Sequence, residues 1–267
     1  CFYKNNNITP VIETDFALDL FVKQLLQQTS VCFDTETTGL NAITAKLVGI
    51  AFSWEAHKGF YVPFPEDTSE AQERIEKLRP FFEDLSIEKI GQNLKYDLKV
   101  LDKYKLSVKG PLFDTMIAHY LINPDMRHNM TILSETYLNY TPVPIEDLIG
   151  KKGKNQKSMR EVALEDVTEY AVEDADITYQ LAQHFKKEMS EANTLSLFNS
   201  IETPLIRVLA SMELEGIRLD VAFLKDLAID LDKDIQKLEQ LIYKQAETVF
   251  NIASPKQLGV VLFEKLK

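Results

Sequence analysis

Cysteine is scarce in this sequence, and its scarcity excludes several protein classes. The 267 residues contain two cysteines, Cys1 and Cys32, too few for the disulfide framework of a small secreted domain. The apolar runs fall far short of a membrane span, and no signal-peptide pattern opens the chain. We therefore expect a cytoplasmic protein without a membrane partner. Because the chain begins with Cys rather than Met, we also expect it to be a piece of a longer protein.

The residues for several kinds of catalysis are also missing. The sequence has no G-x-S-x-G motif, and neither cysteine has an obvious activating partner. Metal-ligand spacing is absent among the histidines, which are His57, His119, His128 and His184. These absences argue against a serine or cysteine nucleophile and against a histidine-bound metal.

Basic residues are outnumbered by acidic ones. The chain has 30 Lys and Arg against 41 Asp and Glu, a net charge of −11. A basic footprint is the usual sign of nucleic-acid binding, so the overall charge argues mildly against that partner. Residues 150–160, however, contain four lysines and an arginine without an acid. This stretch is either a local phosphate-binding surface or a solvated flexible loop.

The order of periodic segments predicts a mixed α/β domain. Three β-like runs have short connectors, which favours an antiparallel meander. Helix-like segments and one more strand-like segment follow, and Ser158 with Glu161 forms a capping box for the last helix. The expected strands are 30–37, 46–54, 58–64 and 87–91, and the expected helices are 15–28, 69–84, 114–122, 130–138, 161–189 and one that begins at "NLKYD". We predict a mixed sheet flanked by helices.

Beyond residue 192 the sequence becomes purely helical in character. Residues 196–215 and 222–248 have the periodicity of long amphipathic helices, and Gly216 between them is a good helix stop. Ser254 and Pro255 have the types expected at the start of one more helix. We therefore expect one domain over residues 1–192 and, over 193–267, the helical start of a truncated second domain.

Two carboxylates interrupt an apolar strand in "VCFDTETTGL". Residues two apart in a strand point to the same side, so Asp34 and Glu36 lie close together. Two like charges so close repel, and one takes up a proton unless a cation lies between them. The alternative is an exposed strand face, which the apolar residues before Asp34 disfavour.

Two helical segments contribute further acids. In "NLKYDLKVL", Asp97 lies at the border of the buried stripe, with Asn93 one turn before it. In "VTEYAVEDADITYQL", Asp174 lies near the middle of the apolar face, one turn after Tyr170. Three neighbouring acids are expected to point away from that face: Glu169, Glu173 and Asp176. A lone buried carboxylate is costly unless it is paired or bound to a metal, so a salt bridge to Lys or Arg is the alternative for Asp174.

Together these segments predict a metal site. They supply four inward-facing acids, Asp34, Glu36, Asp97 and Asp174, with Tyr170 beside the last. Carboxylate oxygens without Cys or His favour magnesium or manganese. Two such ions suit an in-line displacement at phosphorus, so phosphodiester hydrolysis is the chemistry expected here.

The same segments resemble a known family. "DTETTGL", "NLKYD" and "YAVED" are similar to the D-x-E, N-x-x-x-D and Y-x-x-x-D motifs of the DEDDy 3′–5′ exonucleases. The similarity is greatest to the proofreading domain of the family-A DNA polymerases (the bacterial DNA polymerase I family). It includes "FDTM", "GKKGKNQ" and "EDADIT", and "IETPLIRVLASMELEGIRLD" resembles the start of the polymerase thumb.

The resemblance implies a ribonuclease H-like fold and roles for the acids. Asp34 bridges two divalent ions, Mg²⁺ or Mn²⁺ with Zn²⁺ as an alternative at one site. Glu36 and Asp174 complete the first site, and Asp97 holds the second. Tyr170 orients the attacking water together with Glu36.

It also implies a partner, which is a single-stranded or frayed DNA 3′ end. Leu40 wedges against the terminal bases, and Gln92, Asn93 and Arg127 contact the sugar-phosphate. Where the family often has an aromatic residue, this sequence has Ile145, and stacking on a base is worth about 1–3 kcal/mol. The expected protein is a monomer that acts with a polymerase domain near the bacterial nucleoid.

Two alternatives stay open. One is an RNA exonuclease of the ribonuclease D type, which shares the motifs but continues into different helical domains. The other is an exonuclease-fold scaffold or DNA-binding module without activity. The presence of all four acids and the tyrosine favours an active enzyme over the scaffold. No templated synthesis is expected from this chain, because the palm and fingers of a polymerase are absent.

Overall fold

A five-stranded sheet forms the centre of the first part of the chain. The computed structural model describes residues 10–266, in two compact units that divide between Glu215 and Gly216. The strands are β1 (Ser30–Thr37), β2 (Leu47–Glu55), β3 (Lys58–Pro63), β4 (Glu88–Gly91) and β5 (Leu112–Asp114), in the spatial order β3-β2-β1-β4-β5. The β1-β2-β3 pairs are antiparallel, and β4 and β5 continue the sheet in parallel with β1. The predicted meander and mixed α/β fold are confirmed.

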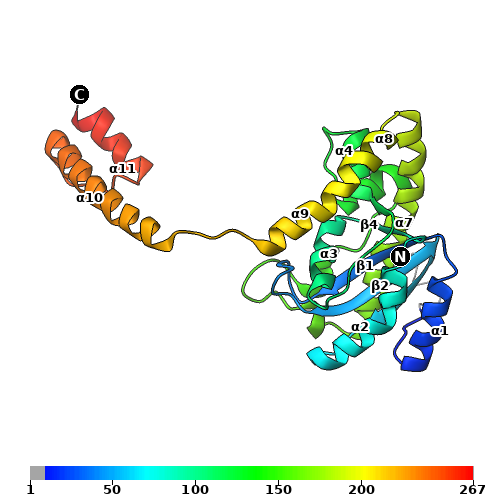
Figure 1. Ribbon diagram of the computed structural model, residues 1–267. Coiled ribbons are helices and arrows are strands. Elements are labelled where there is room, and N and C mark those ends of the chain that lie inside the picture. The colour runs from blue at the N-terminus through cyan, green and yellow to red at the C-terminus, as the bar shows by residue number, and fades with distance from the viewer. Residues whose placement is uncertain (1–9, 267) are drawn as a thin grey trace. The chain divides into compact units, whose positions relative to one another are not determined.

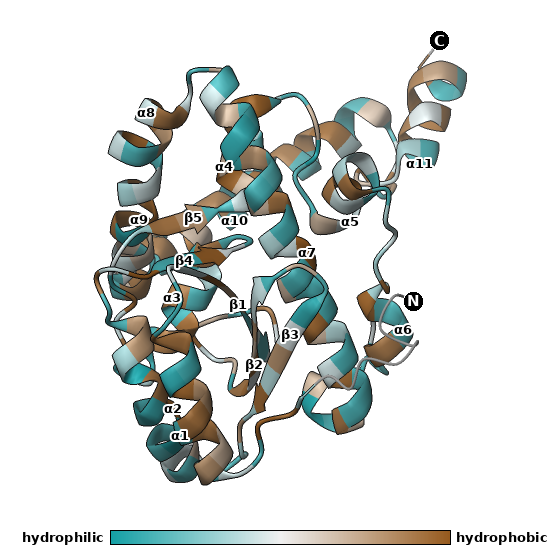
Figure 2. Cartoon of the chain, turned by 90° about the vertical axis from the view of Figure 1, so that its right-hand side faces the viewer, coloured by the Kyte–Doolittle hydropathy of each residue, from teal (hydrophilic) through white to brown (hydrophobic). Residues whose placement is uncertain are grey.

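Helices cover both faces of this sheet. On one face, α1 (Asp15–Leu25) and α2 (Thr68–Phe82) lie side by side and pack on apolar side chains of alternate strand positions, including Phe33 and Phe52 (Figure 1). On the other face, α7 (Leu164–Glu191) packs on Cys32, Ala51 and Tyr61. Brown and teal residues alternate along α1 and α2 in Figure 2, as expected of amphipathic helices. The alternation in β1 therefore sends Asp34 and Glu36 toward α7.

Six further α-helices belong to the described part of the first unit. They are α3 (Leu94–Asp102), α4 (Thr115–Ile122), α5 (Met130–Leu133), α6 (Ile145–Ile149), α8 (Leu195–Leu197) and α9 (Thr203–Glu215). Helix α9 packs on α3, where Glu213 pairs with Lys95 and Lys99 at 2.6 and 2.5 Å. The first compact unit therefore extends to Glu215, beyond the domain boundary expected at residue 192. The assignment of residues 193–267 to a polymerase stays a prediction.

The second unit is helical. It contains α10 (Val221–Ala246) and α11 (Pro255–Val260), and Ser254 caps α11 by accepting the N–H of Gln257. Gly216, at φ 72°, follows the last residue of α9, as expected of a helix stop. Within residues 10–266, no helix has both the length and the apolar content that a membrane crossing requires.

Three local expectations were wrong or incomplete. The capping box of Ser158 and Glu161 closes a short 3₁₀ turn, Met159–Glu161, and α7 begins after it at Leu164. Strand β5, with three residues, and helix α6, with five, were not predicted. Such short elements contain less than two full periods of an apolar pattern, so periodicity does not reveal them.

We expect Gly49→Ala to destabilise the sheet beneath Glu36. Gly49 pairs with Glu36 across β1 and β2, and a Cβ atom there would lie 1.9 Å from the Tyr61 hydroxyl oxygen. Because Tyr61 is fully buried, its ring has to shift, at a cost of about 1–3 kcal/mol in the free energy of unfolding. Urea unfolding followed by circular dichroism measures this. Gly39→Ala is the control, since a Cβ there meets nothing within 4 Å; equal effects of both changes would contradict the packing argument.

Candidate metal centre and active site

Three carboxylates meet where β1 faces α7. Asp34 and Glu36 come from the strand and Asp174 from the helix, and one oxygen of each lies within 4.8 Å of the others. Glu36 and Asp174 are 7% and 8% exposed. Among the residues that the structure describes, no lysine or arginine forms an ion pair with any of the three. The salt-bridge alternative for Asp174 is therefore not observed.

Burial raises the pKa values of all three carboxyl groups, and the crowding of like charges raises two of them further. Burial raises the pKa of Asp34 to about 6. Burial, and then the neighbouring Asp34, raise the pKa of Glu36 and of Asp174 well above the ordinary range. An uncompensated cluster of this kind fits a divalent cation, because a cation between the oxygens removes their repulsion. The all-carboxylate donor set suits Mg²⁺ or Mn²⁺.

Asp97 lies beside this triad and is held differently. It is 3% exposed, more deeply buried than the border position expected for it. Its Oδ1 accepts the backbone N–H of Thr35 at 3.2 Å and the Thr35 hydroxyl at 2.5 Å. Burial and then the charge of Asp34 raise the pKa of Asp97. Asp97 therefore interacts electrostatically with the triad, although it is not one of the three carboxylates that meet within 4.8 Å. The sequence motif does not reveal the anchoring role of Thr35, which lies between the two acids of the D-x-E motif.

Tyr170 contributes a hydroxyl rather than a charge. It lies one turn before Asp174 on α7, and its hydroxyl partly offsets the rise in the pKa of that carboxyl. Burial, followed by Asp174 and Glu36, raises the pKa of Tyr170, so the phenol stays protonated at neutral pH and can donate. A cavity of about 410 Å³ opens beside it, lined also by Val143, Leu148 and Glu173.

The expected contacts to DNA lie on two segments. Leu40 is 89% exposed, and its turn is held by the Tyr96 hydroxyl, which donates to Gly39 O at 2.7 Å. The side chains of Asn93 and Arg127 are exposed. Gln92 Nε2 donates to His128 O at 2.8 Å, which places the 127–128 segment next to the start of α3.

Gln92 therefore has a structural task of its own. Besides its bond to His128, its Oε1 accepts a hydrogen bond from the Thr115 hydroxyl. Both ends of the Gln92 amide are engaged within the protein. Ile145, at the position that is often aromatic, is 37% exposed on α6.

Comparison with known proteins identifies the family of this chain. Residues 10–190 match the family model described as 3′–5′ exonuclease. The chain belongs to the 3′–5′ exonuclease family.

Two curated relatives are bacterial DNA polymerases. DNA polymerase I of Borreliella burgdorferi is 36% identical over 258 residues, which cover 96% of this chain and 28% of that protein. DNA polymerase I of Pseudomonas aeruginosa is 33% identical over 266 residues, covering 96% and 29%. The chain thus spans less than a third of the length of these relatives.

Solved structures share the fold of this exonuclease. The structure described as the POL domain of Pol1 from M. smegmatis, in complex with DNA primer-template and dNTP, has a TM-score of 0.76 at 22% identity and covers 96% of this chain and 41% of its own. Escherichia coli RNase D has a TM-score of 0.61 at 20% identity and covers 77% and 51%. At such identities the likeness concerns the fold alone.

The expectation that Glu173 and Asp176 point away into solvent was wrong. They are 1% and 2% exposed. Glu173 accepts the N–H of Val143 at 2.8 Å and a hydrogen bond from Tyr140, and Asp176 accepts the N–H of His57 at 2.7 Å. Helix α7 of the exonuclease is covered by these segments as well as by the sheet, so it has no single buried face.

We expect Asp34→Asn to stabilise the metal-free exonuclease at pH 8. With a pKa near 6 in the fold and near 4 when unfolded, Asp34 binds its proton more tightly in the native state. The free energy of unfolding of the unmodified protein therefore falls as pH rises from about 4 through 6, and stays lower above. Asparagine removes this loss, so the variant gains about 1–3 kcal/mol over the unmodified protein at pH 8 and little at pH 4.

Chemical denaturation in EDTA at several pH values measures the difference. Asp102→Asn on α3 is the control, because Asp102 is exposed. In a second series, with Mn²⁺ in place of EDTA, the metal should stabilise the unmodified protein and the control more than it stabilises Asp34→Asn. A gain that does not change with pH would contradict the electrostatic cause.

Proposed function

We propose that this chain is the metal-dependent 3′–5′ proofreading exonuclease domain of a DNA polymerase I. It hydrolyses the terminal phosphodiester of a DNA 3′ end and releases nucleoside 5′-monophosphates. The observation that carries this proposal is the triad of Asp34, Glu36 and Asp174, whose carboxylate oxygens lie within 4.8 Å of one another. In the part of the chain that the structure describes, no lysine or arginine pairs with them, and Asp97 lies beside the triad. Membership of the exonuclease family supports the reaction class, and the polymerase relatives support DNA as the substrate.

The proposed mechanism assigns a separate role in hydrolysis to each residue of the site. Asp34, Glu36 and Asp174 would hold one divalent ion, and Asp34 with Asp97 a second. Bound there, such ions lower the pKa of water and neutralise charge on the leaving oxygen. Tyr170 stays protonated and donates a hydrogen bond, while Glu36 accepts one, so the pair orients the attacking water. Asp97 keeps its position because Thr35 binds one of its oxygens.

Surface residues guide the DNA end. Leu40 is a large apolar side chain on an anchored turn, suited to wedge against the terminal base. Asn93 and Arg127 present an amide and a guanidinium to the sugar-phosphate. Frayed or mispaired ends are preferred because their terminal nucleotide is already unpaired.

Digestion of a 5′-labelled single-stranded DNA with Mg²⁺ or Mn²⁺ tests the proposal. We expect a ladder that shortens from the 3′ end and disappears in EDTA and in the Asp34→Ala/Glu36→Ala double variant. Intact DNA in every lane, from protein that circular dichroism finds folded, would contradict it and favour a scaffold. An RNA oligonucleotide of the same sequence is the parallel substrate, and faster loss of RNA would favour the ribonuclease D alternative.

Tyr170→Phe isolates the contribution of the hydroxyl. The change keeps the ring and removes only the donor to Asp174 and water, so we expect kcat to fall about 10- to 100-fold with little change in KM. Steady-state digestion of the same DNA measures both constants. Tyr179→Phe, on the same helix, is the matched control, and an unchanged kcat in Tyr170→Phe would remove Tyr170 from the mechanism.

The lysine-rich loop should supply salt-dependent affinity. Lys151, Lys152, Lys154 and Lys157 are exposed, and the loop ends at Arg160, whose Nη2 donates to Leu47 O at 2.5 Å beside the end of β1. Each lysine that neutralises a phosphate of single-stranded DNA contributes about 0.7 to the slope of log K against log salt. Replacing all four by Gln should therefore reduce this slope by about 3.

Fluorescence anisotropy in EDTA, where no hydrolysis occurs, measures binding at several salt concentrations. The matched control replaces exposed lysines of other elements by Gln: Lys23, Lys58, Lys105 and Lys187. It changes the net charge equally. The same loss of slope in both quadruple variants would make the effect one of overall charge rather than of the loop.

A further inference from the structure

We propose that Asp114 is a positioning residue for the active site of this exonuclease. It fixes the first turn of α3 and thereby places Asp97 and frees the side chain of Asn93. This inference rests on the proposed function, since it assigns a task in metal and substrate binding. Asp114 belongs to the "FDTM" segment, to which the sequence motifs attach no role.

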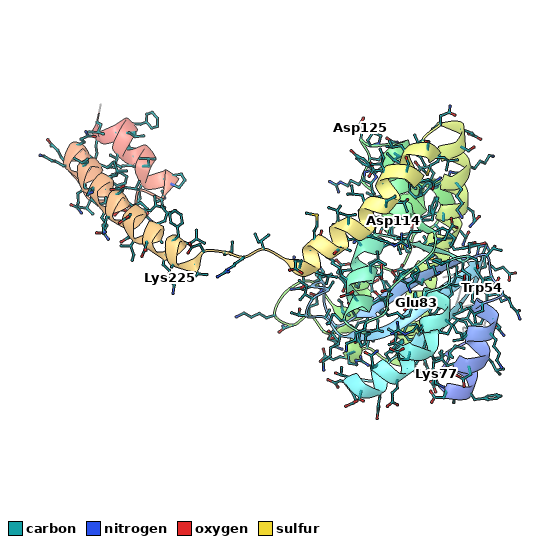
Figure 3. All side chains as sticks on the ribbon, viewed as in Figure 1. Trp54, Lys77, Glu83, Asp114, Asp125 and Lys225 are labelled. Carbon is teal, nitrogen blue, oxygen red and sulfur yellow. The ribbon has the colours of Figure 1, made fainter. Side chains whose placement is uncertain are left out.

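Asp114 ties two helix starts to one carboxylate. It is the last residue of β5, is 1% exposed and pairs with Gly91 at the end of β4. Its oxygens accept four backbone N–H groups, two at the start of α3 and two at the start of α4. The donors are Asn93 at 3.2 Å, Leu94 at 2.8 Å, Met116 at 2.9 Å and Ile117 at 3.3 Å. Figure 3 shows Asp114 labelled between α4 and α3.

This arrangement explains the conformation of Asn93. Asn93 is the N-cap residue of α3, yet its side chain makes no capping hydrogen bond, and its backbone is left-handed at φ 61° and ψ 47°. An asparagine at this position ordinarily caps the helix with its own side chain. Here Asp114 accepts the backbone N–H groups of Asn93 and Leu94 and so holds Asn93 in a conformation from which its own side chain does not cap the helix. The Asn93 amide is left exposed, where a nucleotide can reach it.

The same contact restrains Asp97. Leu94 is the first residue of α3 and Asp97 follows less than one turn later, so the position of the helix start sets the position of the Asp97 carboxylate. The turn before α3 has little slack, because a Cβ on Gly91 would lie 2.3 Å from a Leu94 methyl carbon. Asp97 is thus held from β1 through Thr35 and from β5 through Asp114.

Two substitutions separate this role from simple helix capping. Asp114→Ser keeps an N-cap side chain for α4 but lacks the second oxygen that reaches α3. Asp114→Asn keeps the shape and loses the charge. Both should weaken Mn²⁺ binding about 10- to 100-fold, as loss of a group that orients a metal ligand does. Asp67→Asn is the matched control, because Asp67 caps α2 by accepting the N–H groups of Ser69 and Glu70.

Calorimetric titration with Mn²⁺ is the decisive measurement, and steady-state digestion adds kcat and KM. Asn93→Ala should raise KM in the unmodified protein and have no further effect in Asp114→Ser. If Asp114→Ser folds, binds Mn²⁺ as tightly as the Asp67→Asn control and keeps the effect of Asn93→Ala, Asp114 is only a helix cap and the proposal is wrong. If the unmodified protein binds Mn²⁺ but digests no DNA, the proposed function fails while the Mn²⁺ titration still tests Asp114.

Discussion

Repulsion among buried carboxylates is the constraint on which the rest of this structure depends. Asp34, Glu36 and Asp174 lie within 4.8 Å of one another, and Asp97 is close enough for Asp34 to raise its pKa. Such a group would separate if its members were on flexible segments. The acids instead come from the central strand and from two helices packed against it. Because the apolar packing on both faces of β1 fixes these elements, the cluster keeps a shape that a cation can fill.

The buried acids of this exonuclease fall into two kinds, and their hydrogen bonds separate them. Asp114, Glu173 and Asp176 accept backbone N–H groups, so their charge is satisfied and they hold segments together. Among the described residues, no backbone N–H donates to a side-chain oxygen of the triad of Asp34, Glu36 and Asp174. Asp97 is intermediate, since Thr35 satisfies one of its oxygens. The triad, which has no such N–H partner, is the group whose charge a bound metal would satisfy most directly.

Much of the site could be predicted from the sequence because side chains alternate strictly between the two faces of a strand. Two acids in D-x-E order on an apolar strand have to share a face, and Asp174 in an apolar helical stripe has to be buried. The exposure of Glu173 and Asp176 was wrong for a physical reason. A helical wheel assumes one neighbour, whereas α7 has the sheet on one side and residues 140–143 and His57 on others. Contacts such as Thr35 with Asp97, 62 residues apart, depend on tertiary packing that no local pattern encodes.

The same electrostatics connects metal binding with substrate binding in the proposed reaction. A chain of net charge −11 with a carboxylate cluster at its active site repels a phosphodiester. Divalent ions at the triad would reverse the local sign, so the DNA end could approach only after the metals are bound. The lysine-rich loop would then have a distinct task, because it would attract the strand without binding a metal. Affinity for the strand and competence at the terminal phosphate would therefore be separable properties, the first set by salt and the second by divalent metal.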